Sequence, residues 1–543
     1  MSFASPFPEV DIPSASVYNY LFGRLNDADA DRVALVEAKS GRATTYREMV
    51  ARIRTFAGAL AACGVGVGDV IGVLVPNSSA FAVAFHGVLR AGATATTINV
   101  LFTAKDIAQQ LTDSGATMLV TIDALLPQAK EAATAAGISD ENLVVLDGAG
   151  RAASGHPNAA ELLAAGAPAP QVTFAPSAHL AALPYSSGTT GTPKGVMLTH
   201  RNLVANVAQI RPLHGMVSDD VVLAVLPFFH IYGMTVLLNA ALHARARLVV
   251  MQNFELDAFL GNIAEHKCTI AFIAPPVAVA LAKDPLVDSY DLSSLNTVMS
   301  GAAPLDAELG QAVAERLNCK VVQGYGMSEL SPVSHITPFD GGRLNMRVDA
   351  PLSSVGWTVS NAASKIVDPE SGREIEVPAQ GVSETGELWF KGPNVMAGYL
   401  HNDEATRATI DPEGWLHTGD LAQVDAAGCV YIVDRLKELI KYKGYQVPPA
   451  ELEAVLLSHP QIADAAVVGV LDAAGEEVPK AFVVRLSPHD SADDTAGLTE
   501  AEVMEFVAGQ VAPYKKVRQV EFIDAIPKSA SGKILRKDLR SGR

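Results

Sequence analysis

The chain has few cysteines, a deficit of basic residues and no long uncharged apolar run. Its 543 residues include four cysteines, Cys63, Cys268, Cys319 and Cys429, and no two of them form a Cys-x-x-Cys pair. This spacing argues against a disulfide scaffold and a structural zinc site, and it suits a reducing compartment. Lys and Arg number 41 against 59 Asp and Glu, a formal charge of −18. Such an acidic balance argues against nucleic acid or an anionic membrane surface as the main partner.

Signals for export or membrane insertion are also lacking. The first eight residues contain no basic segment followed by an apolar core, and the last three are not Ser-Lys-Leu. The most apolar stretch, residues 81–100, contains His86 and Arg90. It falls short of the run of about 20 apolar residues that a spanning helix needs. We therefore expect a cytoplasmic protein without integral membrane association.

The composition is that of a folded chain, because 49% of the residues are hydrophobic and only 18% are charged. Short β-branched runs alternate with longer Ala-rich segments over the first 350 residues. The apolar runs are residues 70–76, 93–100, 117–121, 143–146, 221–226, 247–251 and 269–273, with a helical segment at 81–91. Strands that are apolar on both faces and joined by helices predict an α/β fold with parallel sheets covered on both sides.

Two regions depart from this alternation. Residues 354–390 carry short, turn-rich strand signals without a long helix, which predicts an antiparallel or barrel-like subdomain. After Trp415 a strand is expected at 428–434 and a helix at 450–458, followed by a smaller α+β segment with a polar surface loop at 487–494. We predict an N-terminal domain of residues 1–434 and a C-terminal domain of residues 435–543.

The strongest local motif is Tyr-Ser-Ser-Gly-Thr-Thr-Gly-Thr-Pro-Lys-Gly at residues 185–195. Its glycines let backbone N–H groups turn toward an anion, while its hydroxyls and Lys194 add donors and positive charge. It is not a Walker A loop, because Pro193 and Gly195 stand where that motif needs Gly and Ser or Thr. A flexible linker is the alternative, and the preceding strand at 180–183 and the Pro-Lys-Gly sequence disfavour it. The motif predicts a phosphate-binding loop.

Two further motifs suit a nucleotide. In Gln-Gly-Tyr-Gly-Met-Ser-Glu (323–329), Tyr325 could lie flat against a planar ring, and Glu329 could hold a divalent metal against phosphate. A core tyrosine between turns is an equal alternative there. In Trp-Leu-His-Thr-Gly-Asp (415–420), Asp420 could accept hydrogen bonds from ribose hydroxyls, with Arg435 donating to the same sugar. A turn or helix cap is the alternative role of Asp420.

Two lysine-bearing segments follow. Residues 435–446 contain Lys437, Lys441, Lys443 and Gly444, a basic patch in an acidic chain, which favours an anion site over a solvated face. Near the end, Lys533 follows a Ser-Gly turn that can hold its side chain outward. Taken alone, this last segment reads as a basic terminal helix.

Together, in this order, the five motifs resemble the adenylate-forming superfamily of acyl-CoA synthetases, luciferases and peptide-synthetase adenylation domains. The resemblance runs from about residue 46 to residue 539. Within the superfamily, residues 186–200, 229–232, 324–327 and 438–447 look most like those of 4-coumarate–CoA ligases.

The resemblance implies an ATP-dependent carboxylate–CoA ligase that acts through an acyl-adenylate, with ATP, Mg²⁺ and coenzyme A as cosubstrates and cofactor. Its acid would be 4-coumarate or a related aromatic acid. The alternatives are a medium-chain fatty acyl-CoA synthetase and an enzyme that loads a carrier protein in trans. It also implies a large N-terminal domain with a small β-barrel-like subdomain and a small mobile C-terminal domain that rotates about Lys437.

The resemblance also implies residue roles. The β- and γ-phosphates would be bound by Ser186, Ser187, Gly188, Thr189, Thr190 and Lys194. Adenine would lie among Ala302, Gln323, Gly324 and Tyr325, with the ribose on Asp420 and Arg435, the α-phosphate on Ser328 and Mg²⁺ on Glu329. Lys533 would bridge carboxylate and α-phosphate in the first step; in the second, Lys441 and Gln446 would enter and Lys443 and Gly444 would contact coenzyme A. The acid would be bound by His230, Tyr232, Thr235, Ala274, Gly301, Ala302, Gly324 and Val333. His230 would also be catalytic, lying by the acyl carboxylate and gating the path of the thiol, with a buried core histidine as the alternative.

Departures from the plant ligases bear on coenzyme A and on the acid. Asn253 stands where those relatives usually have a lysine, which argues against one contact to a coenzyme A phosphate. Ser334 stands where they often have leucine, which predicts a more polar or roomier pocket for the ring. No acid occupies residues 228–229, where amino-acid adenylation domains place an aspartate for the substrate ammonium, which argues against an amino acid. Small residues at Gly301 and Ala302 are expected to leave space for a flat ring or an extended chain.

Overall fold

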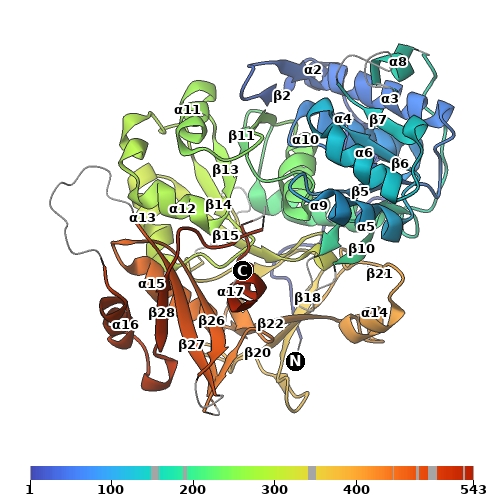
Figure 1. The fold of residues 1–543 in the computed structure, drawn as a ribbon. Helices are drawn as coiled ribbons and strands as arrows, with labels where there is room; N and C mark the ends of the chain where they lie inside the picture. Colours follow the sequence, from blue (N-terminus) through green and yellow to red (C-terminus); the bar gives the residue numbers. More distant parts are fainter. Residues whose placement is uncertain are drawn as a thin grey trace.

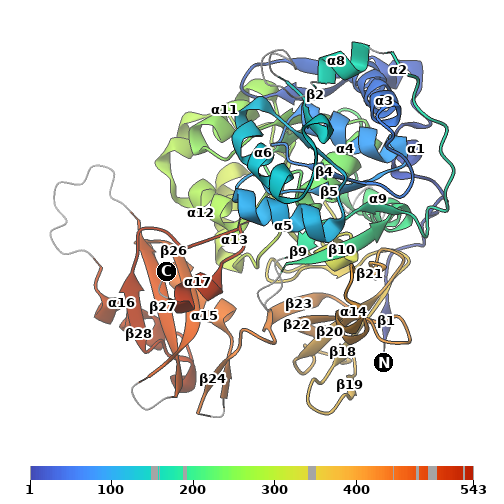
Figure 2. The same cartoon turned by 45° about the vertical axis from the view of Figure 1, so that its right-hand side comes forward.

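The computed structural model describes residues 2–147, 157, 159–164, 166–186, 193–339, 350–443, 445–472, 476–486, 498–529 and 532–541. Two α/β layers built on parallel strands lie side by side, an antiparallel sheet packs beneath them, and the last hundred residues form a separate α+β unit (Figures 1 and 2). In the described residues no helix is long and apolar enough to cross a membrane.

The first sheet has the order β21-β10-β8-β5-β4-β6-β7, with β9 paired to β10. Its strands are β4 (Val70–Val73), β5 (Thr94–Thr97), β6 (Met118–Thr121), β7 (Leu143–Val145), β8 (Leu180–Ala182), β9 (Tyr185–Ser186), β10 (Lys194–Thr199) and β21 (Gly398–Tyr399). The strands from β7 to β8 are parallel, and β10 is antiparallel to β8. The strands predicted at 70–76, 93–100, 117–121 and 143–146 are confirmed, each shorter than its apolar run.

Helices of this half cover the sheet and connect it to its neighbour. They are α1 (Val17–Phe22), α2 (Asp27–Ala30), α3 (Tyr46–Ala62), α4 (Ser79–Ala91), α5 (Ala104–Ser114), α6 (Leu126–Ala135), α8 (Ala159–Ala164), α9 (His200–His214) and α10 (Ala240–Ala244). The predicted helix at 81–91 is α4: the Ser78 side chain accepts from the Phe81 N–H at its start, and Gly92, with φ 90°, ends it. Side chains of α4, α9 and α10 enter one large apolar core that joins both parallel sheets.

The second sheet has the order β17-β16-β15-β14-β13-β11-β12-β2-β3. Its strands are β2 (Val33–Glu37), β3 (Ala43–Thr45), β11 (Val221–Ala224), β12 (Arg247–Val250), β13 (Ile270–Ile273), β14 (Thr297–Ser300), β15 (Lys320–Gly326), β16 (Val333–Ile336) and β17 (Trp357–Thr358). The six strands from β2 to β15 run parallel, which confirms the predictions at 221–226, 247–251 and 269–273. One face carries α11 (Leu256–His266), α12 (Pro275–Lys283) and α13 (Ala307–Leu317), and the π-helix η3 (Tyr232–Asn239) enters the core on the other.

The third sheet confirms the predicted antiparallel subdomain. Its order is β1-β18-β20-β22-β23, with β19 paired to β18. The strands are β1 (Phe3–Ala4), β18 (Ala363–Val367), β19 (Glu374–Ile375), β20 (Gly386–Lys391), β22 (Leu416–Val424) and β23 (Val430–Arg435), and α14 (Asp403–Thr409) precedes β22. The register of β22 and β23 sets Asp420 opposite Arg435.

The C-terminal unit is the predicted smaller α+β segment. It contains the hairpin β24 (Ile440–Tyr442) and β25 (Tyr445–Val447), and the sheet β26 (Ile462–Leu471), β27 (Glu477–Arg485) and β28 (Gln519–Phe522). Its helices are α15 (Pro449–Ser458), α16 (Glu500–Ala508) and α17 (Arg536–Ser541), so the helix predicted at 450–458 is confirmed. The expected surface loop at 487–494 lies outside the described residues.

Candidate active site

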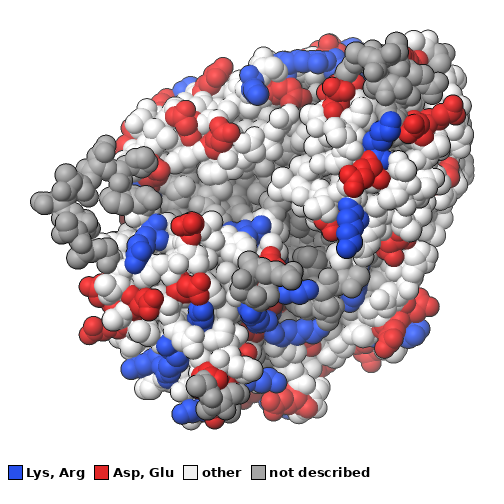
Figure 3. Space-filling view, viewed as in Figure 1, with Lys and Arg blue, Asp and Glu red and all other residues white. Residues whose placement is uncertain are grey.

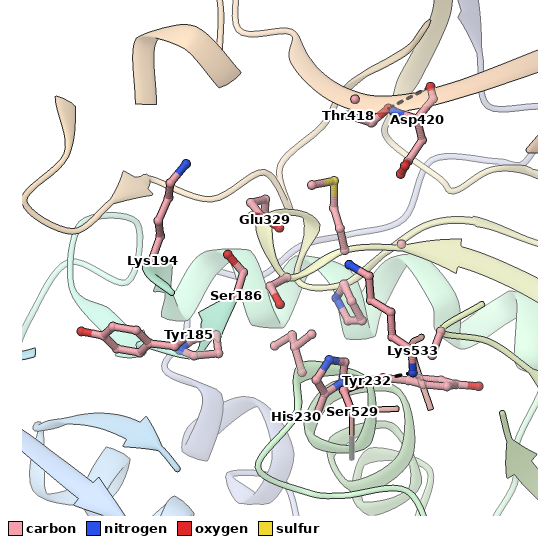
Figure 4. Close-up of a pocket in the computed structure, with 18 of the residues that line it drawn as sticks. Tyr185, Ser186, Lys194, His230, Tyr232, Glu329, Thr418, Asp420, Ser529 and Lys533 are labelled. Atoms are coloured by element: carbon pink, nitrogen blue, oxygen red, sulfur yellow. Dashed lines mark hydrogen bonds between the residues drawn. The ribbon is translucent and has the colours of Figure 1, made fainter. Parts of the chain in front are cut away.

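A cavity of about 570 Å³ opens where the two parallel sheets, the antiparallel sheet and the C-terminal unit meet. Several Lys and Arg side chains border the hollow near the centre of the face in Figure 3. The wall is formed by the ends of β5, β9, β14 and β15, the start of η3, the β22–β23 pair and the turn that carries Lys533 (Figure 4). Polar and apolar side chains therefore line the same cavity.

One end of the cavity is built on the β22–β23 pair. Arg435 Nε lies 3.2 Å from Asp420 Oδ1, and the Tyr325 hydroxyl donates to Asp420 Oδ2 at 2.5 Å. Thr418 Oγ1 accepts from the Asp420 N–H at 3.1 Å and so fixes the backbone that carries the carboxylate (Figure 4). Burial, and then the charge of Asp420, raise the pKa of Tyr325 well above its ordinary value, so its hydroxyl remains a donor at neutral pH. This end can hold a group rich in hydroxyls beside an aromatic ring.

A second group of polar side chains lies around Glu329, in the short helix η5 (Ser328–Leu330). Glu329 is only 5% exposed, and the Tyr399 hydroxyl donates to its Oε1 at 2.7 Å. The Lys194 ammonium lies 4.9 Å from the centre of the Tyr399 ring, and the pairing of β9 with β10 sets Lys194 opposite Ser186. A lysine, a hydroxyl and a carboxylate thus face the same region.

The chemistry of this group fits a magnesium ion only together with phosphate. The described residues contain no cluster of three or more His, Cys, Asp or Glu side chains suited to a metal. Mg²⁺ bound through one carboxylate and substrate phosphates is a common arrangement, and Glu329 can supply that carboxylate. The predicted phosphate ligands Ser187, Gly188, Thr189 and Thr190 lie outside the described residues.

Lys533 enters the cavity from the C-terminal unit on a tight turn (Figure 4). Its N–H donates to Ser529 Oγ at 3.2 Å, the Ser529 N–H donates to its carbonyl at 2.8 Å, and Gly532 holds the left-handed φ of 87° that the turn requires. Burial, and then the charge of Arg435, lower the pKa of Lys533 to about 8. The side chain is therefore mostly an ammonium at pH 7.

At the other end of the cavity, His230 precedes η3 and Tyr232 begins it. Burial, and then the charge of Lys533, lower the pKa of His230 to about 4, so the imidazole is neutral at pH 7. Its Nδ1 accepts from the Tyr232 N–H at 3.3 Å. Tyr232 is only 8% exposed, and its hydroxyl has no hydrogen-bond partner among the described residues. A buried hydroxyl without a partner is costly, so it is a good contact for a polar group on a ligand.

The expected space at Gly301 is taken by the Tyr232 ring. A Cβ at Gly301 would lie 2.9 Å from both Cε1 and Cζ of that ring, so the glycine makes room for tyrosine and not for the acid. Ala302, the next residue, lines the cavity with a left-handed φ of 73°. The expectation of open space is therefore corrected at Gly301.

The cavity gathers most of the predicted residues. Those that line it are Ser186, Lys194, His230, Tyr232, Gly301, Ala302, Gly324, Tyr325, Ser328, Glu329, Val333, Asp420, Arg435, Lys437 and Lys533. Those that lie elsewhere are Thr235, Ala274, Gln323, Lys441, Lys443 and Gln446, while Gly444 is outside the described residues.

Most of the predicted residues that lie outside the cavity wall have clear surroundings elsewhere. The Gln323 carboxamide bonds both the N–H and the carbonyl of Leu305 at 3.0 Å, so it shapes a loop behind the wall. Thr235 is fully buried inside η3. The three C-terminal residues are exposed on the β24–β25 hairpin.

Several lining residues stand in none of the predicted motifs, among them Thr97, Asn99 and Glu387. Thr97 ends β5, and its hydroxyl donates to the Phe229 carbonyl at 2.7 Å. Polar residues at the carboxyl end of a parallel strand are a recognisable signal, because ligands bind at that edge of open α/β sheets. Glu387 offers no such signal: it accepts from the Gly419 N–H at 2.8 Å only because β20 pairs with β22.

Known protein families match most of the chain. The AMP-binding enzyme family matches residues 24–400, and the AMP-binding enzyme C-terminal domain matches residues 451–533. The chain is 43% identical to 4-coumarate–CoA ligase 5 of Oryza sativa subsp. japonica, over 99% of this chain and 97% of that protein.

Solved structures of similar fold include two aromatic-acid ligases. An anthranilate CoA ligase in complex with anthranoyl-AMP is 27% identical, with a TM-score of 0.85 over 98% of both chains. A benzoate CoA ligase from Burkholderia xenovorans LB400 is 28% identical, with a TM-score of 0.83 over 97% of this chain and 100% of that one.

Proposed function

Because the chain belongs to the AMP-binding enzyme family, we propose that it is an AMP-forming acid–CoA ligase. It would join a carboxylic acid to ATP, release pyrophosphate and transfer the acyl group to the thiol of coenzyme A. The observation that carries the proposal is the Lys533 ammonium, placed in one cavity with the Asp420–Arg435 pair and the Glu329 carboxylate. The ammonium matches the negative charge that develops when a carboxylate attacks the α-phosphorus of a phosphoanhydride, and the Glu329 carboxylate can hold a cation that shares this charge.

In the first half-reaction a carboxylate oxygen would form a bond to the α-phosphorus while the bond from that phosphorus to pyrophosphate breaks. Negative charge grows on the phosphoryl oxygens, and a fixed ammonium stabilises that charge most in the transition state. Lys533 would supply this ammonium between the acid and the α-phosphate, with Ser328 donating to the same phosphate. Glu329 would hold Mg²⁺, which neutralises phosphate charge when bound.

The remaining contacts to ATP follow the two polar groups in the cavity. We assign the β- and γ-phosphates to Lys194 and the loop Ser186, Ser187, Gly188, Thr189 and Thr190. The adenine would lie near Ala302, Gly324 and Tyr325, with Gln323 supporting the wall from behind. Asp420 and Arg435 would bind the ribose hydroxyls as acceptor and donor.

The second half-reaction requires Lys533 to leave, because the thiol must reach the same carbonyl carbon. We propose a mobile domain of residues 435–543 that rotates about Lys437, after a first domain of residues 1–434. Separate family matches at 24–400 and 451–533 support this division. Rotation would bring the exposed hairpin to the cavity, with Lys441 and Gln446 at the reacting group and Lys443 and Gly444 on coenzyme A.

For the acid we propose 4-coumarate or a related aromatic acid. Relatives named 4-coumarate–CoA ligase, 42–43% identical over 99% of the chain, support an aromatic substrate. The unpartnered Tyr232 hydroxyl supports it from the structure, since a phenolic hydroxyl on the acid would satisfy it. Thr235 and Ala274, initially expected in the wall, would then act from outside the acid's contact surface. We place the enzyme in the cytoplasm, where the four unpaired cysteines suit a reducing compartment.

The test is pyrophosphate release with a panel of acids, with and without coenzyme A. We expect 4-coumarate to release pyrophosphate fastest, ahead of benzoate, anthranilate and octanoate, and coenzyme A to be consumed in equal amount. Preference for octanoate would refute the aromatic substrate, and release without coenzyme A consumption would point to a carrier-protein acceptor. No release with any acid would refute the ligase assignment.

A further inference from the structure

Helix α12 contacts the C-terminal unit at both of its ends. At the C-terminal end of α12, Lys283 donates hydrogen bonds to three carbonyls of residues 457–462. At the N-terminal end, Ala274 lies against Gly532. We propose that α12 is a clamp for the C-terminal domain, and that Lys283 is a positioning residue for adenylate formation. The inference rests on the proposed two-step function and adds to it a residue that no motif contains.

The Lys283 contact joins a cation to a helix end. Its Nζ donates to the carbonyl of Leu457 at 3.0 Å, of His459 at 3.3 Å and of Ile462 at 2.9 Å. Leu457 lies in the last turn of α15 and His459 is the residue that caps it. Carbonyls at a helix C-terminus lack intrahelical donors and carry the negative end of the helix dipole, so an ammonium is their natural partner. In both views α12 lies above α15, on the side of the upper layers that faces the C-terminal unit (Figures 1 and 2).

Within the described part of the chain, the same ammonium has no carboxylate partner to retain it in the N-terminal domain. Among the described residues, Lys283 forms no salt bridge. It is half-buried, and burial lowers its pKa. Rotation of the C-terminal domain would therefore remove all three of these acceptors at once.

The second contact, between Gly532 and Ala274, lies in the turn that carries Lys533. Gly532 has a φ of 87°, and a Cβ built on it would lie 2.9 Å from the Ala274 Cβ. Ala274 caps the start of α12, whose nine residues span about 13 Å. Two contacts separated by that length restrain the orientation of the C-terminal domain as well as its position. The turn that carries Lys533 thus rests on one end of the helix, while Lys283 holds α15 at the other.

Contacts made in only one of two domain orientations shift the equilibrium toward that orientation. The clamp favours the orientation in which Lys533 lies in the cavity. Its loss should slow adenylate formation and spare thioester formation, which needs the other orientation.

The experiment compares Lys283→Met with Lys283→Arg and with a matched control, Lys267→Met. Lys267 is an exposed lysine of the same domain whose partner, Asp291, lies 2.8 Å away in that domain. We expect Lys283→Met to lower ATP–pyrophosphate exchange by about tenfold or more, since bonds from a charged group each correspond to roughly a tenfold or larger shift in equilibrium. Thioester formation from supplied acyl-adenylate should stay within twofold of wild type, and Lys283→Arg should retain most of the exchange.

Unchanged exchange in Lys283→Met, or an equal loss in both half-reactions, would overturn the proposal. If Lys283→Met does not fold, Ala274→Val provides a second test, because its added methyl groups would push the Gly532 turn away from the cavity. That variant should also lose exchange selectively, and equal losses would again refute the clamp.

Domain orientation gives a readout that does not depend on the substrate. One dye is placed on the exposed native Cys63 and another on Gln519→Cys in β28, with the partly exposed Cys319 changed to serine. We expect energy transfer in Lys283→Met to shift toward a second population that wild type lacks, and an unchanged distribution would overturn the clamp. If wild type shows no exchange with any acid, the proposed function fails, whereas this measurement still decides the clamp.

Discussion

Replacing Lys533 with alanine should separate the two half-reactions. The ammonium enters the cavity from a turn of the C-terminal unit, and burial together with Arg435 lowers its pKa to about 8. At pH 7 about nine in ten of these side chains carry a proton, since the pKa lies one unit higher. The variant therefore removes a full positive charge from the position where phosphoryl charge would develop.

The expected loss of rate follows from how strongly a fixed charge stabilises the transition state in a site that excludes most water. Removing one such donor costs about 3–4 kcal/mol of transition-state stabilisation, which corresponds to roughly 10²–10³ in rate. ATP–pyrophosphate exchange should fall by that factor. Thioester formation from supplied acyl-adenylate should change little, because the lysine would be absent from the cavity in that step.

The matched control is Lys537→Ala, four residues further along in α17, where the side chain is exposed. It removes the same charge from the same tail and should leave both half-reactions unchanged. An equal loss of both rates in Lys533→Ala would refute the reasoning, since it would mean that the lysine supports the fold or both steps.

Three further predictions concern the same cavity and its support. Above about pH 8 the Lys533 ammonium is lost, so kcat/KM for pyrophosphate exchange should fall about tenfold per pH unit, and Lys533→Arg should abolish that fall. Gly301→Ala would push the buried Tyr232 ring into the cavity, so the KM for an aromatic acid should rise about tenfold or more. The KM for acetate should rise less, and an equal rise for both acids would contradict this. Arg536→Leu leaves the buried Glu453 carboxylate without its partner at 2.7 Å, and urea denaturation should show a loss of about 3–5 kcal/mol that Glu453→Leu in the same chain restores.

Much of the candidate site could be predicted because its chemistry is local in sequence. Ser186 and Lys194 come from one short motif and both line the cavity, and Asp420 and Arg435 needed only the pairing of two adjacent strands to meet at 3.2 Å. The parallel strands were predictable for a similar reason. A run that is apolar on both faces must be covered on both faces, so the pattern constrains the layer architecture as well as the element.

Other residues could not be predicted, because their roles depend on elements far apart in the chain. Nothing near Gly301 indicates that its hydrogen makes room for Tyr232, 69 positions earlier. Gln323 belongs to a recognisable motif, yet its carboxamide holds Leu305 and not the cavity. Local patterns show which residue types are present, whereas long-range packing decides which atoms they reach.

The sequence by itself determined the α/β layers, the order of the motifs and the kind of chemistry that they support, because hydrophobic periodicity and motif composition act over a few residues. The tertiary structure alone decided how Lys533 reaches the cavity and what holds it there. Lys283 shows the difference: in the sequence it is one lysine at the end of a helix, and in the fold its ammonium bonds three carbonyls about 175 residues away. Such a contact depends on how α12 and α15 are placed relative to each other, which no local pattern encodes.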